Sequence, residues 1–278
     1  MKNNYIKSPL NYQGGKYKLL PIILPMFPSN ISTFVDLFGG GFNVGINVDA
    51  EHIIYNDICE QVVTFLKYMK NNNIEDILSK IDSHIQEYQL TKENRDGYLQ
   101  LREIYNTGTK TPDVFYTLLC YSFNNQIRFN SKGEYNMPFG KNRSSFNPTL
   151  RQKFIDFHNK LNEIDCRFLN KSFECFDFSN LTEHDFVYID PPYYNSIATY
   201  NENGGWTETK ETLLLNTLDS LNNQGVKFAL SNNLKYNNPI LDNWKDKYHV
   251  HYLNYDYSNC NYQKKDKSKD CEVLITNY

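Results

Sequence analysis

The stretch that decides the fold is Phe186-Val187-Tyr188-Ile189-Asp190-Pro191-Pro192-Tyr193. Its apolar beginning predicts a buried strand. Because a proline disfavours helical backbone in the residue before it, we expect Asp190 to lie extended at the end of that strand. The two prolines fix φ and carry no N–H group, so they leave backbone carbonyls beside the Asp190 carboxylate. The predicted result is a pocket lined by hydrogen-bond acceptors.

Such a pocket suits an amino group that has two hydrogens to donate, and Tyr193 adds a flat face on which an aromatic ring can stack. The amino group of adenine meets both conditions. A simpler interpretation is equally open at this point, because an aspartate followed by two prolines is also a common turn after a strand. The rest of the sequence must decide between the two.

Composition bounds the class of protein. The chain has 278 residues, of which 40% are hydrophobic and 15% aromatic, so it can bury a full core as one large domain or as a domain with an insertion. No stretch approaches the about 18 apolar residues of a membrane span, and residues 1–5 lack the apolar segment of a signal peptide. We therefore expect a cytoplasmic protein with no membrane partner. The six cysteines form no CxxC pair and no Cys/His cluster at zinc spacing, which predicts reduced thiols and no metal.

Basic residues gather in three places although the net charge is only -3. Residues 1–20 hold four lysines and no acid, residues 126–171 hold nine Lys/Arg against four Asp/Glu, and four further lysines lie within 264–269. Each cluster alone is more often an ordinary solvated surface. Three of them around a catalytic strand would line a cleft for the phosphates of a nucleic acid.

A glycine turn marks the first strand. Residues 31–38 predict a strand that breaks at Gly39-Gly40-Gly41, followed by a predicted helix over 42–48 and a second strand over 52–55 that ends at Asn56-Asp57. The dinucleotide fingerprint needs a third glycine where Val44 stands. A close backbone approach after the first strand and an acid after the second therefore favour an adenosine cofactor without a pyrophosphate, such as S-adenosylmethionine.

Strands and helices alternate along most of the chain, which predicts an α/β fold with a largely parallel sheet and with ligands at the carboxyl ends of its strands. A helical and polar stretch interrupts the alternation. We therefore expect a catalytic domain of residues 1–60 and 156–278, and an inserted recognition domain of residues 61–155 with an exposed loop or hairpin over 124–148. Helices are predicted over 58–71, 74–88, 94–106, 114–119 and 209–222 and from residue 148, with further strands over 226–231, 248–254 and 272–276.

Several short motifs follow one another in a fixed order. They are Tyr12-Gln13-Gly14-Gly15-Lys16-Tyr17, Phe34-Val35-Asp36-Leu37-Phe38-Gly39-Gly40-Gly41, Tyr55-Asn56-Asp57-Ile58, Asn124-Asn125-Gln126-Ile127-Arg128-Phe129-Asn130, Lys132-Gly133-Glu134-Tyr135-Asn136-Met137-Pro138-Phe139-Gly140 and Leu230-Ser231-Asn232-Asn233. With the Asp190 stretch, this set resembles the Dam-type (D12 class, alpha group) adenine-specific DNA methyltransferases, and most of all the bacteriophage Dam enzymes. The resemblance covers nearly the whole chain.

This resemblance implies a Rossmann-like, S-adenosylmethionine-dependent methyltransferase sheet with an inserted, mostly helical target-recognition domain. The implied reaction moves a methyl group from S-adenosylmethionine to the N6 amino group of an adenine flipped out of duplex DNA, in GATC or another GAT-initial site. The implied catalytic residues are Asp190, Pro191, Pro192 and Tyr193. The implied cofactor-binding residues are Tyr12, Lys16, Asp36, Phe38, Gly39, Gly41, Asp57, Phe173 and Asp190, with Asp57 on the ribose and Phe173 on the cofactor adenine. The implied DNA-binding residues are Asn124, Gln126, Arg128, Asn130, Lys132, Pro138, Lys141 and Arg143.

The chain departs from the family pattern in two places within this DNA-reading segment. Asn142 stands where the phage-type enzymes have a basic residue, with Arg143 one position later, and Gln126 replaces a residue that is commonly apolar. These departures concern the outer bases of the recognition site and leave the expected reaction unchanged.

Other interpretations stay open. Singly, Lys16 could be a surface lysine, Asp57 a helix N-cap, Arg128 a phosphate contact and Tyr193 a core residue. The chain could also methylate RNA or a protein glutamine, or it could be an inactive DNA-binding relative. For the favoured function we expect double-stranded DNA as the partner, a possible cognate restriction endonuclease, a monomer or weak dimer, and a location in the bacterial nucleoid or a phage-infected cell.

Overall fold

A computed structural model describes residues 5–196, 205–253 and 271–278. Its centre is a seven-stranded sheet in the order β3-β2-β1-β4-β5-β7-β6, in which β7 alone runs antiparallel to its neighbours. The predicted α/β fold with a largely parallel sheet is therefore confirmed. The strands are β1 (Ile31–Asp36), β2 (Ala50–Asn56), β3 (Cys166–Leu169), β4 (Phe186–Ile189), β5 (Lys227–Asn233), β6 (His249–Tyr252) and β7 (Glu272–Thr276).

The strand β4 lies in the middle of the sheet because all four of its residues are apolar and both of its faces are covered. Phe186 and Tyr188 pack into a core on one face, and Val187 and Ile189 pack into a second core on the other. This alternation is the ordinary pattern of a strand between two layers. It places Asp190 on the same face as Tyr188.

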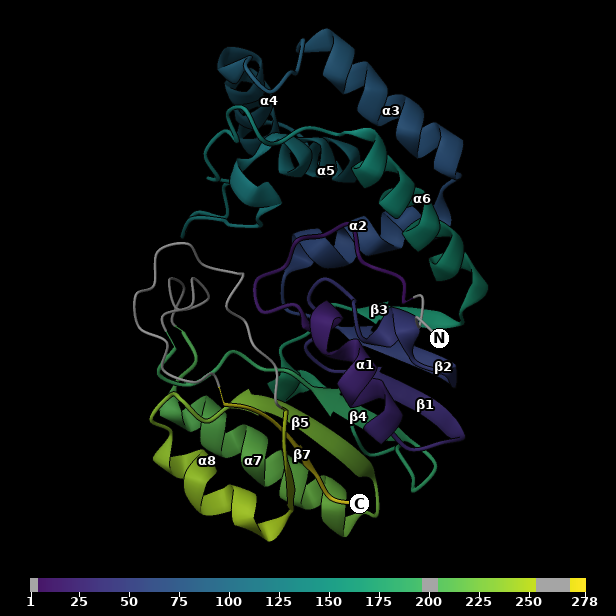
Figure 1. Cartoon of the computed structure of the whole chain (residues 1–278), viewed down its shortest axis with the longest axis vertical. Coiled ribbons are helices and arrows are strands. Elements are labelled where there is room, and N and C mark those ends of the chain that lie inside the picture. The colour runs from purple at the N-terminus through teal and green to yellow at the C-terminus, as the bar shows by residue number, and fades with distance from the viewer. Residues whose placement is uncertain (1–4, 197–204, 254–270) are drawn as a thin grey trace.

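Helices cover both faces of the sheet (Figure 1). The helices α7 and α8 lie on the side of the second core, whereas α1 lies against β1 and β4 on the opposite side. The helices α3, α4 and α5 form a layer beyond α2 and α6, at the far end of the molecule from α7 and α8 (Figure 1). The α-helices are α1 (Leu20–Ile23), α2 (Glu60–Asn71), α3 (Ile74–Glu87), α4 (Arg95–Thr107), α5 (Pro112–Tyr121), α6 (Pro148–Glu163), α7 (Glu208–Asn223) and α8 (Pro239–Trp244). The 3-10 segments are η1 (Lys16–Leu19), η2 (Leu24–Met26), η3 (Gly45–Asn47), η4 (Phe123–Asn125), η5 (Phe173–Cys175) and η7 (Lys245–Lys247).

Capping residues set the starts of several helices. The side chain of Asn73 accepts a hydrogen bond from the N–H of Glu75 at the start of α3, and that of Asn147 accepts one from the N–H of Leu150 at the start of α6, where Pro148 occupies the first turn. The helices predicted over 58–71, 74–88, 94–106, 114–119 and 209–222 and from 148 are confirmed, with small shifts at their ends.

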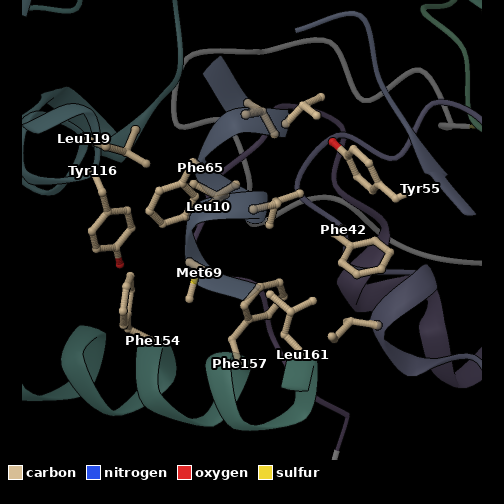
Figure 2. Close-up of a cluster of buried hydrophobic side chains, with 14 of the residues drawn as sticks. Leu10, Phe42, Tyr55, Phe65, Met69, Tyr116, Leu119, Phe154, Phe157 and Leu161 are labelled. Atoms are coloured by element: carbon tan, nitrogen blue, oxygen red, sulfur yellow. The ribbon is translucent and has the colours of Figure 1, made fainter. Parts of the chain in front are cut away.

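One aromatic cluster joins the helical layer to the sheet (Figure 2). Phe65 of α2 stacks on Tyr116 of α5 at 5.0 Å between ring centroids, and Tyr116 also lies 4.7 Å from Phe154 of α6. The cluster continues to Phe42, whose ring meets that of Tyr55 on β2 at 5.1 Å. The glycine turn after β1 is thus packed against the same core as the helices. The division into domains stays a prediction, and its limit at 155/156 falls inside the continuous helix α6.

The helix predicted over 42–48 is wrong. Only Gly45–Asn47 forms a short 3-10 turn, because Phe42 has a left-handed backbone (φ 60°) that stops a helix from starting there. A bond from the side chain of Asn47 to the carbonyl of Ile6 ties this turn to the N-terminal segment. The strand β3 and the short helical run of residues 16–26 have no counterpart among the predicted elements. No helix within the part of the chain that the structure describes is long and apolar enough to cross a membrane.

Candidate active site

The polar ends of four strands meet on one face of the sheet. Asp36 pairs in register with Tyr188, which lies two residues before Asp190, so Asp36 and Asp190 point to the same side. Tyr188 pairs with Ala229, which lies four residues before Asn233, and Asn233 pairs with Glu272. Because β7 is antiparallel, its first residue rather than its last lies at this edge. The candidate site therefore includes Glu272, which no sequence argument pointed to.

Lys16 is the cation of the site. Its ammonium lies 2.7 Å from Oδ1 of Asp190 and donates to the hydroxyl of Tyr193 at 2.9 Å and to the carbonyl of Gly14 at 3.1 Å. These contacts use all three of its donors. Only 4% of the Lys16 side chain is exposed, so it is not a surface lysine. The segment before η1 thereby brings the predicted N-terminal motif onto the end of β4.

Tyr193 folds back over the end of the sheet. Its hydroxyl lies 3.3 Å from Oδ1 of Asp190 and 3.2 Å from Oε2 of Glu272. The other oxygen of Glu272 accepts a hydrogen bond from Nδ2 of Asn233 at 3.0 Å. Lys16, Asp190, Tyr193 and Glu272 thus form one connected polar cluster, which we call the Asp190 cluster.

Burial changes the pKa values of the acidic side chains in this cluster. Loss of solvation raises the pKa of Asp190, and the neighbouring Lys16 ammonium and the Tyr193 hydroxyl oppose that rise. Loss of solvation also raises the pKa of Glu272. The Lys16 ammonium opposes this rise, and repulsion from Asp190 adds to it. One lysine therefore faces two buried acidic side chains.

Asp57 lies at the end of β2, beside the glycine turn. Its Oδ2 accepts a hydrogen bond from the N–H of Gly40 and its Oδ1 accepts one from the N–H of Cys59, both at 2.8 Å. The side chain is buried, and this loss of solvation raises its pKa. The backbone N–H of Ile58 also hydrogen-bonds this carboxylate, and a carboxylate with about four acceptor sites still has capacity for a ligand hydroxyl.

The glycines of the turn are required by close contacts. A Cβ on Gly39 would lie 2.2 Å from the ring of Tyr55, and Gly40 has a left-handed φ of 48°. A Cβ on Gly41 would lie 3.2 Å from Cβ of Tyr12, so Tyr12 lies against the turn. The glycines are therefore required because Tyr55 and Tyr12 pack directly against the backbone of the turn.

Asp36 ends β1 beneath this turn. Its Oδ2 accepts a hydrogen bond from the N–H of Gly45 at 3.1 Å. Burial raises the pKa of Asp36 to about 7, and repulsion from Asp190 and Asp57 adds to the rise. The buried carboxylate is thus poised to change its charge near neutral pH.

An aromatic cluster lies on the second core, where Phe38 and Phe173 are brought together from two distant segments. Their ring centroids are 5.6 Å apart, and Trp206 contacts Phe38 at 5.6 Å and Phe173 at 5.5 Å. The indole N–H of Trp206 donates to Glu211, whose other oxygen accepts from Asn238 at 2.7 Å. Trp206 is a residue that the sequence reasoning missed, because it belongs to none of the short motifs.

The predicted DNA-reading segment forms a hairpin over residues 126–136. Phe129 and Tyr135 pair across it, and Asn130 closes its turn through both ends of its side-chain amide. The guanidinium of Arg128 is held flat against Asn136 by hydrogen bonds at 2.8 and 2.9 Å. Arg128 is thereby oriented before any ligand arrives, whereas the side chain of Asn130 is engaged within the hairpin.

Exposed side chains flank this hairpin. Arg143 donates to Oδ1 of Asn124 at 3.0 Å, and its guanidinium lies 4.9 Å from the ring centroid of Phe123. Phe123 is 40% exposed. Its exposure could not be read from the sequence, since phenylalanine is buried by default. Lys132, Pro138 and Lys141 are exposed as well.

Asn11 connects the hairpin with the N-terminal segment. Its side chain donates to the carbonyl of Asn124 at 2.7 Å, and its backbone forms a bridge with Gln126. The lysine cluster predicted within 264–269 lies outside the described residues. Within the described ranges, no group of three or more His, Cys, Asp or Glu side chains could hold a metal ion.

Comparison with known proteins identifies similar sequences. The family described as D12 class N6 adenine-specific DNA methyltransferase matches residues 12–259. The chain is 49% identical over 283 residues to the Type II methyltransferase M.FokI of Planomicrobium okeanokoites and 44% identical over 283 residues to the modification methylase StsI of Streptococcus sanguinis. It is 32% identical over 280 residues to the modification methylase LlaI of Lactococcus lactis subsp. lactis.

These alignments cover nearly the whole chain but less than half of each relative. They span 99%, 99% and 98% of this chain, in the same order, and 43% of each relative. The special likeness to the bacteriophage enzymes stays a prediction.

Proposed function

The chain belongs to the D12 class of N6 adenine-specific DNA methyltransferases, and on that premise we propose that it transfers a methyl group from S-adenosylmethionine to the N6 amino group of an adenine in duplex DNA. The observation that carries this proposal is the Asp190 cluster. Asp190 follows the central strand β4, is oriented by Lys16, and lies beside the carbonyl groups of two prolines. A carboxylate held in this way suits an amino group as its ligand.

The proposed chemistry relies on fixed acceptors. The exocyclic nitrogen of adenine is a weak nucleophile because its lone pair is delocalised into the ring, and it cannot be reached inside the duplex, so the base must flip out. Asp190 and the carbonyl of Pro191 would accept its two hydrogens while the base stacks on Tyr193. This arrangement would direct the nitrogen lone pair away from the ring plane. Positioning and fixed dipoles of this kind account for much of enzymatic rate enhancement.

The residues present fit the proposed cofactor. Asp57 offers a carboxylate at the position where a ribose diol is held in related sheets. The buried amide nitrogen of Asn232, at the end of β5, has no hydrogen-bond partner among the described residues and is free to donate to a ligand. When bound, S-adenosylmethionine supplies a sulfonium methyl group for in-line attack. Tyr12, Lys16, Asp36, Phe38, Gly41 and Phe173 complete the proposed cofactor site.

The hairpin supports the proposal that DNA is read in its major groove. Arg128 presents an oriented guanidinium, which is the side-chain group best matched to the two acceptors of guanine. We propose that Arg128 reads a guanine in a GATC or other GAT-initial site, and that Lys132, Lys141 and Arg143 contact phosphates. Asn124, Gln126, Asn130 and Pro138 belong to the same proposed surface. The division into a catalytic domain and a recognition domain of residues 61–155 belongs to this proposal as well.

Type II methyltransferases and modification methylases are among the similar proteins. Their names favour a role beside a cognate restriction endonuclease, whose site the methyl group would protect. We also propose that the protein acts on DNA in the cytoplasm of its host, as a monomer or weak dimer.

Two other functions remain as outcomes of the test. A methyltransferase of RNA or of a protein glutamine would use the same acceptors, but the basic hairpin favours duplex DNA. An inactive DNA-binding relative is disfavoured by the intact Asp190 cluster, because a protein without transfer activity has no need to bury two carboxylates around one lysine.

The test is to express the chain in cells whose DNA lacks methyladenine and to sequence that DNA with a method that reports methyladenine in context. We expect methyladenine at one short recurring site, and none when Asp190→Asn is expressed to the same level. Unmodified DNA from cells that contain the folded wild-type chain would overturn the proposal.

A further inference from the structure

We propose that Glu272 is a positioning residue for methyl transfer, which accepts the hydrogen bond of the Tyr193 hydroxyl and so keeps the acceptor strength of Asp190 for an amino hydrogen of the target base. This inference rests on the function proposed above. It adds a residue from the antiparallel strand β7 to a site otherwise built from the ends of parallel strands.

The hydroxyl of Tyr193 has one proton and two carboxylates within reach. It lies 3.3 Å from Asp190 and 3.2 Å from Glu272, while its oxygen accepts from the ammonium of Lys16 at 2.9 Å. A phenol can donate only one hydrogen bond at a time. Tyr193 and Lys16 contact the same oxygen of Asp190, Oδ1. If the proton points to Asp190, it adds a second donor to that oxygen and draws negative charge from the carboxylate that has to accept the adenine amino group. If it points to Glu272, the charge of Asp190 is kept for that contact.

The neighbours of Glu272 determine which of its carboxylate oxygens accepts from Asn233 and which accepts from Tyr193. Oδ1 of Asn233 accepts the backbone N–H groups of Lys235 at 3.1 Å and Cys271 at 3.3 Å, so its Nδ2 must face Glu272. This Nδ2 donates to Oε1 of Glu272 at 3.0 Å, which leaves Oε2 for Tyr193. Donors therefore stand on both sides of Glu272.

Only a carboxylate satisfies both donors. A glutamine at this position would accept from Asn233 and present an N–H group to Tyr193. It would nevertheless be less costly to bury than a carboxylate. Glu272 is 6% exposed, and burying an ionised carboxylate is unfavourable unless it is well paired. The requirement for two acceptors explains why an acid stands at this position. It also identifies Glu272→Gln as the informative substitution, because Asn233 would hold its carbonyl and turn its amide toward Tyr193.

The inference predicts a reversed hydrogen bond in Glu272→Gln. The new amide would donate to the oxygen of Tyr193, and the phenol proton would turn to Asp190. We expect the single-turnover rate of methyl transfer to fall roughly 10- to 100-fold, which corresponds to one hydrogen bond to a charged group. The affinities for S-adenosylmethionine and for DNA should stay unchanged, since neither ligand is contacted by Glu272 in this account.

A double-mutant cycle with Tyr193→Phe separates this role from a merely structural one. The phenylalanine keeps the stacking face and removes the competing proton. In the Glu272→Gln background we therefore expect Tyr193→Phe to restore part of the lost rate, whereas in the Glu272 background it should give no gain. Glu272→Asp keeps two acceptor oxygens and should be faster than Glu272→Gln. If Glu272→Gln does not fold, as judged by thermal unfolding, Glu272→Ala replaces it in the same cycle.

The outcomes are distinguishable. A wild-type rate in Glu272→Gln, or a Tyr193→Phe effect of the same size in both backgrounds, would overturn the inference while an active wild-type enzyme upholds the proposed function. A folded wild-type chain with no activity on any duplex would overturn both.

Discussion

Asp190 is the residue on which the proposed transfer depends most. We expect Asp190→Asn to abolish methyl transfer in single-turnover assays, because the amide turns one of the two acceptor oxygens into a donor. Duplex binding should survive, since phosphate contacts supply most of the affinity and Asp190 makes none. Fluorescence anisotropy measures that binding. Asparagine is the matched choice here because its amide oxygen can still accept a hydrogen bond from the buried ammonium of Lys16, whereas Asp190→Ala would leave no acceptor at that position. Turnover near that of the wild type with saturating cofactor would contradict the assignment.

Asp57 tests the cofactor site. We expect Asp57→Ala to weaken S-adenosylmethionine binding in calorimetry by about 1.5–3 kcal/mol for each ribose hydrogen bond that is lost. The carboxylate also holds the N–H groups of Gly40 and Cys59, so part of any effect is structural. Asp57→Asn is the control, because it keeps an oxygen for one of these groups. Unchanged affinity in Asp57→Ala would mean that Asp57 serves only the turn.

The raised pKa of Asp36, at about 7, predicts a pH-dependent stability. The folded state binds this proton more tightly than the unfolded state, whose aspartates have the ordinary value of about 3.9. The contribution of Asp36 to the free energy of unfolding is therefore fully present below about pH 3.9. It is lost as the pH rises through about 7 and does not change further above that pH. As the pH is raised from 5 to 7, we expect the free energy of unfolding of Asp36→Asn to rise relative to that of the wild type by at most about 2–3 kcal/mol. Urea unfolding of both proteins at several pH values measures this gain, and parallel curves for the two proteins would refute it.

The hairpin proposed to read DNA carries basic side chains suited to two kinds of contact. Arg128 is oriented by Asn136, whereas Lys132 is exposed near the turn. We expect Arg128→Ala to relax discrimination at one base pair by about 1–3 kcal/mol, and Lys132→Ala to weaken binding to all sequences and to flatten its salt dependence. Methylation rates on oligonucleotides substituted at each site position test both variants. If Arg128→Ala slows every substrate by the same factor, Arg128 is a phosphate clamp.

The sequence predicted the parallel strands of the site well, because each ends in a polar motif after an apolar run. Asp36, Asp57 and Asp190 follow β1, β2 and β4 at the expected edge. Glu272 was missed for a physical reason. The rule that ligands lie at the carboxyl ends of strands directs attention away from the first residue of a strand, and only the antiparallel direction of β7 brings that residue to the site. The failed helix over 42–48 has a similar cause, since a tertiary bond from Asn47 and the left-handed Phe42 overrule its local pattern.

The sheet and the helices share one core, and Asn11 links the N-terminal segment to the hairpin. The order of the motifs predicted which segments would meet, but not how closely they would touch. Contacts such as Phe65 on Tyr116 depend on helix packing, which short motifs do not encode. Reading of the site and methyl transfer are therefore expected to be performed by parts of one packed body.

The central claim is that this chain methylates N6 of adenine in duplex DNA. The most direct measurement incubates the purified chain with S-adenosylmethionine that carries a labelled methyl group. Separate reactions contain duplex DNA, single-stranded DNA or RNA of mixed sequence, or a mixture of proteins. Mass spectrometry of the hydrolysed products then identifies the methylated group. We predict labelled N6-methyladenine from duplex DNA, and none when Asp190→Asn replaces the wild type. Label on another base, on RNA or on glutamine, with adenine in duplex DNA unmodified, would contradict the account.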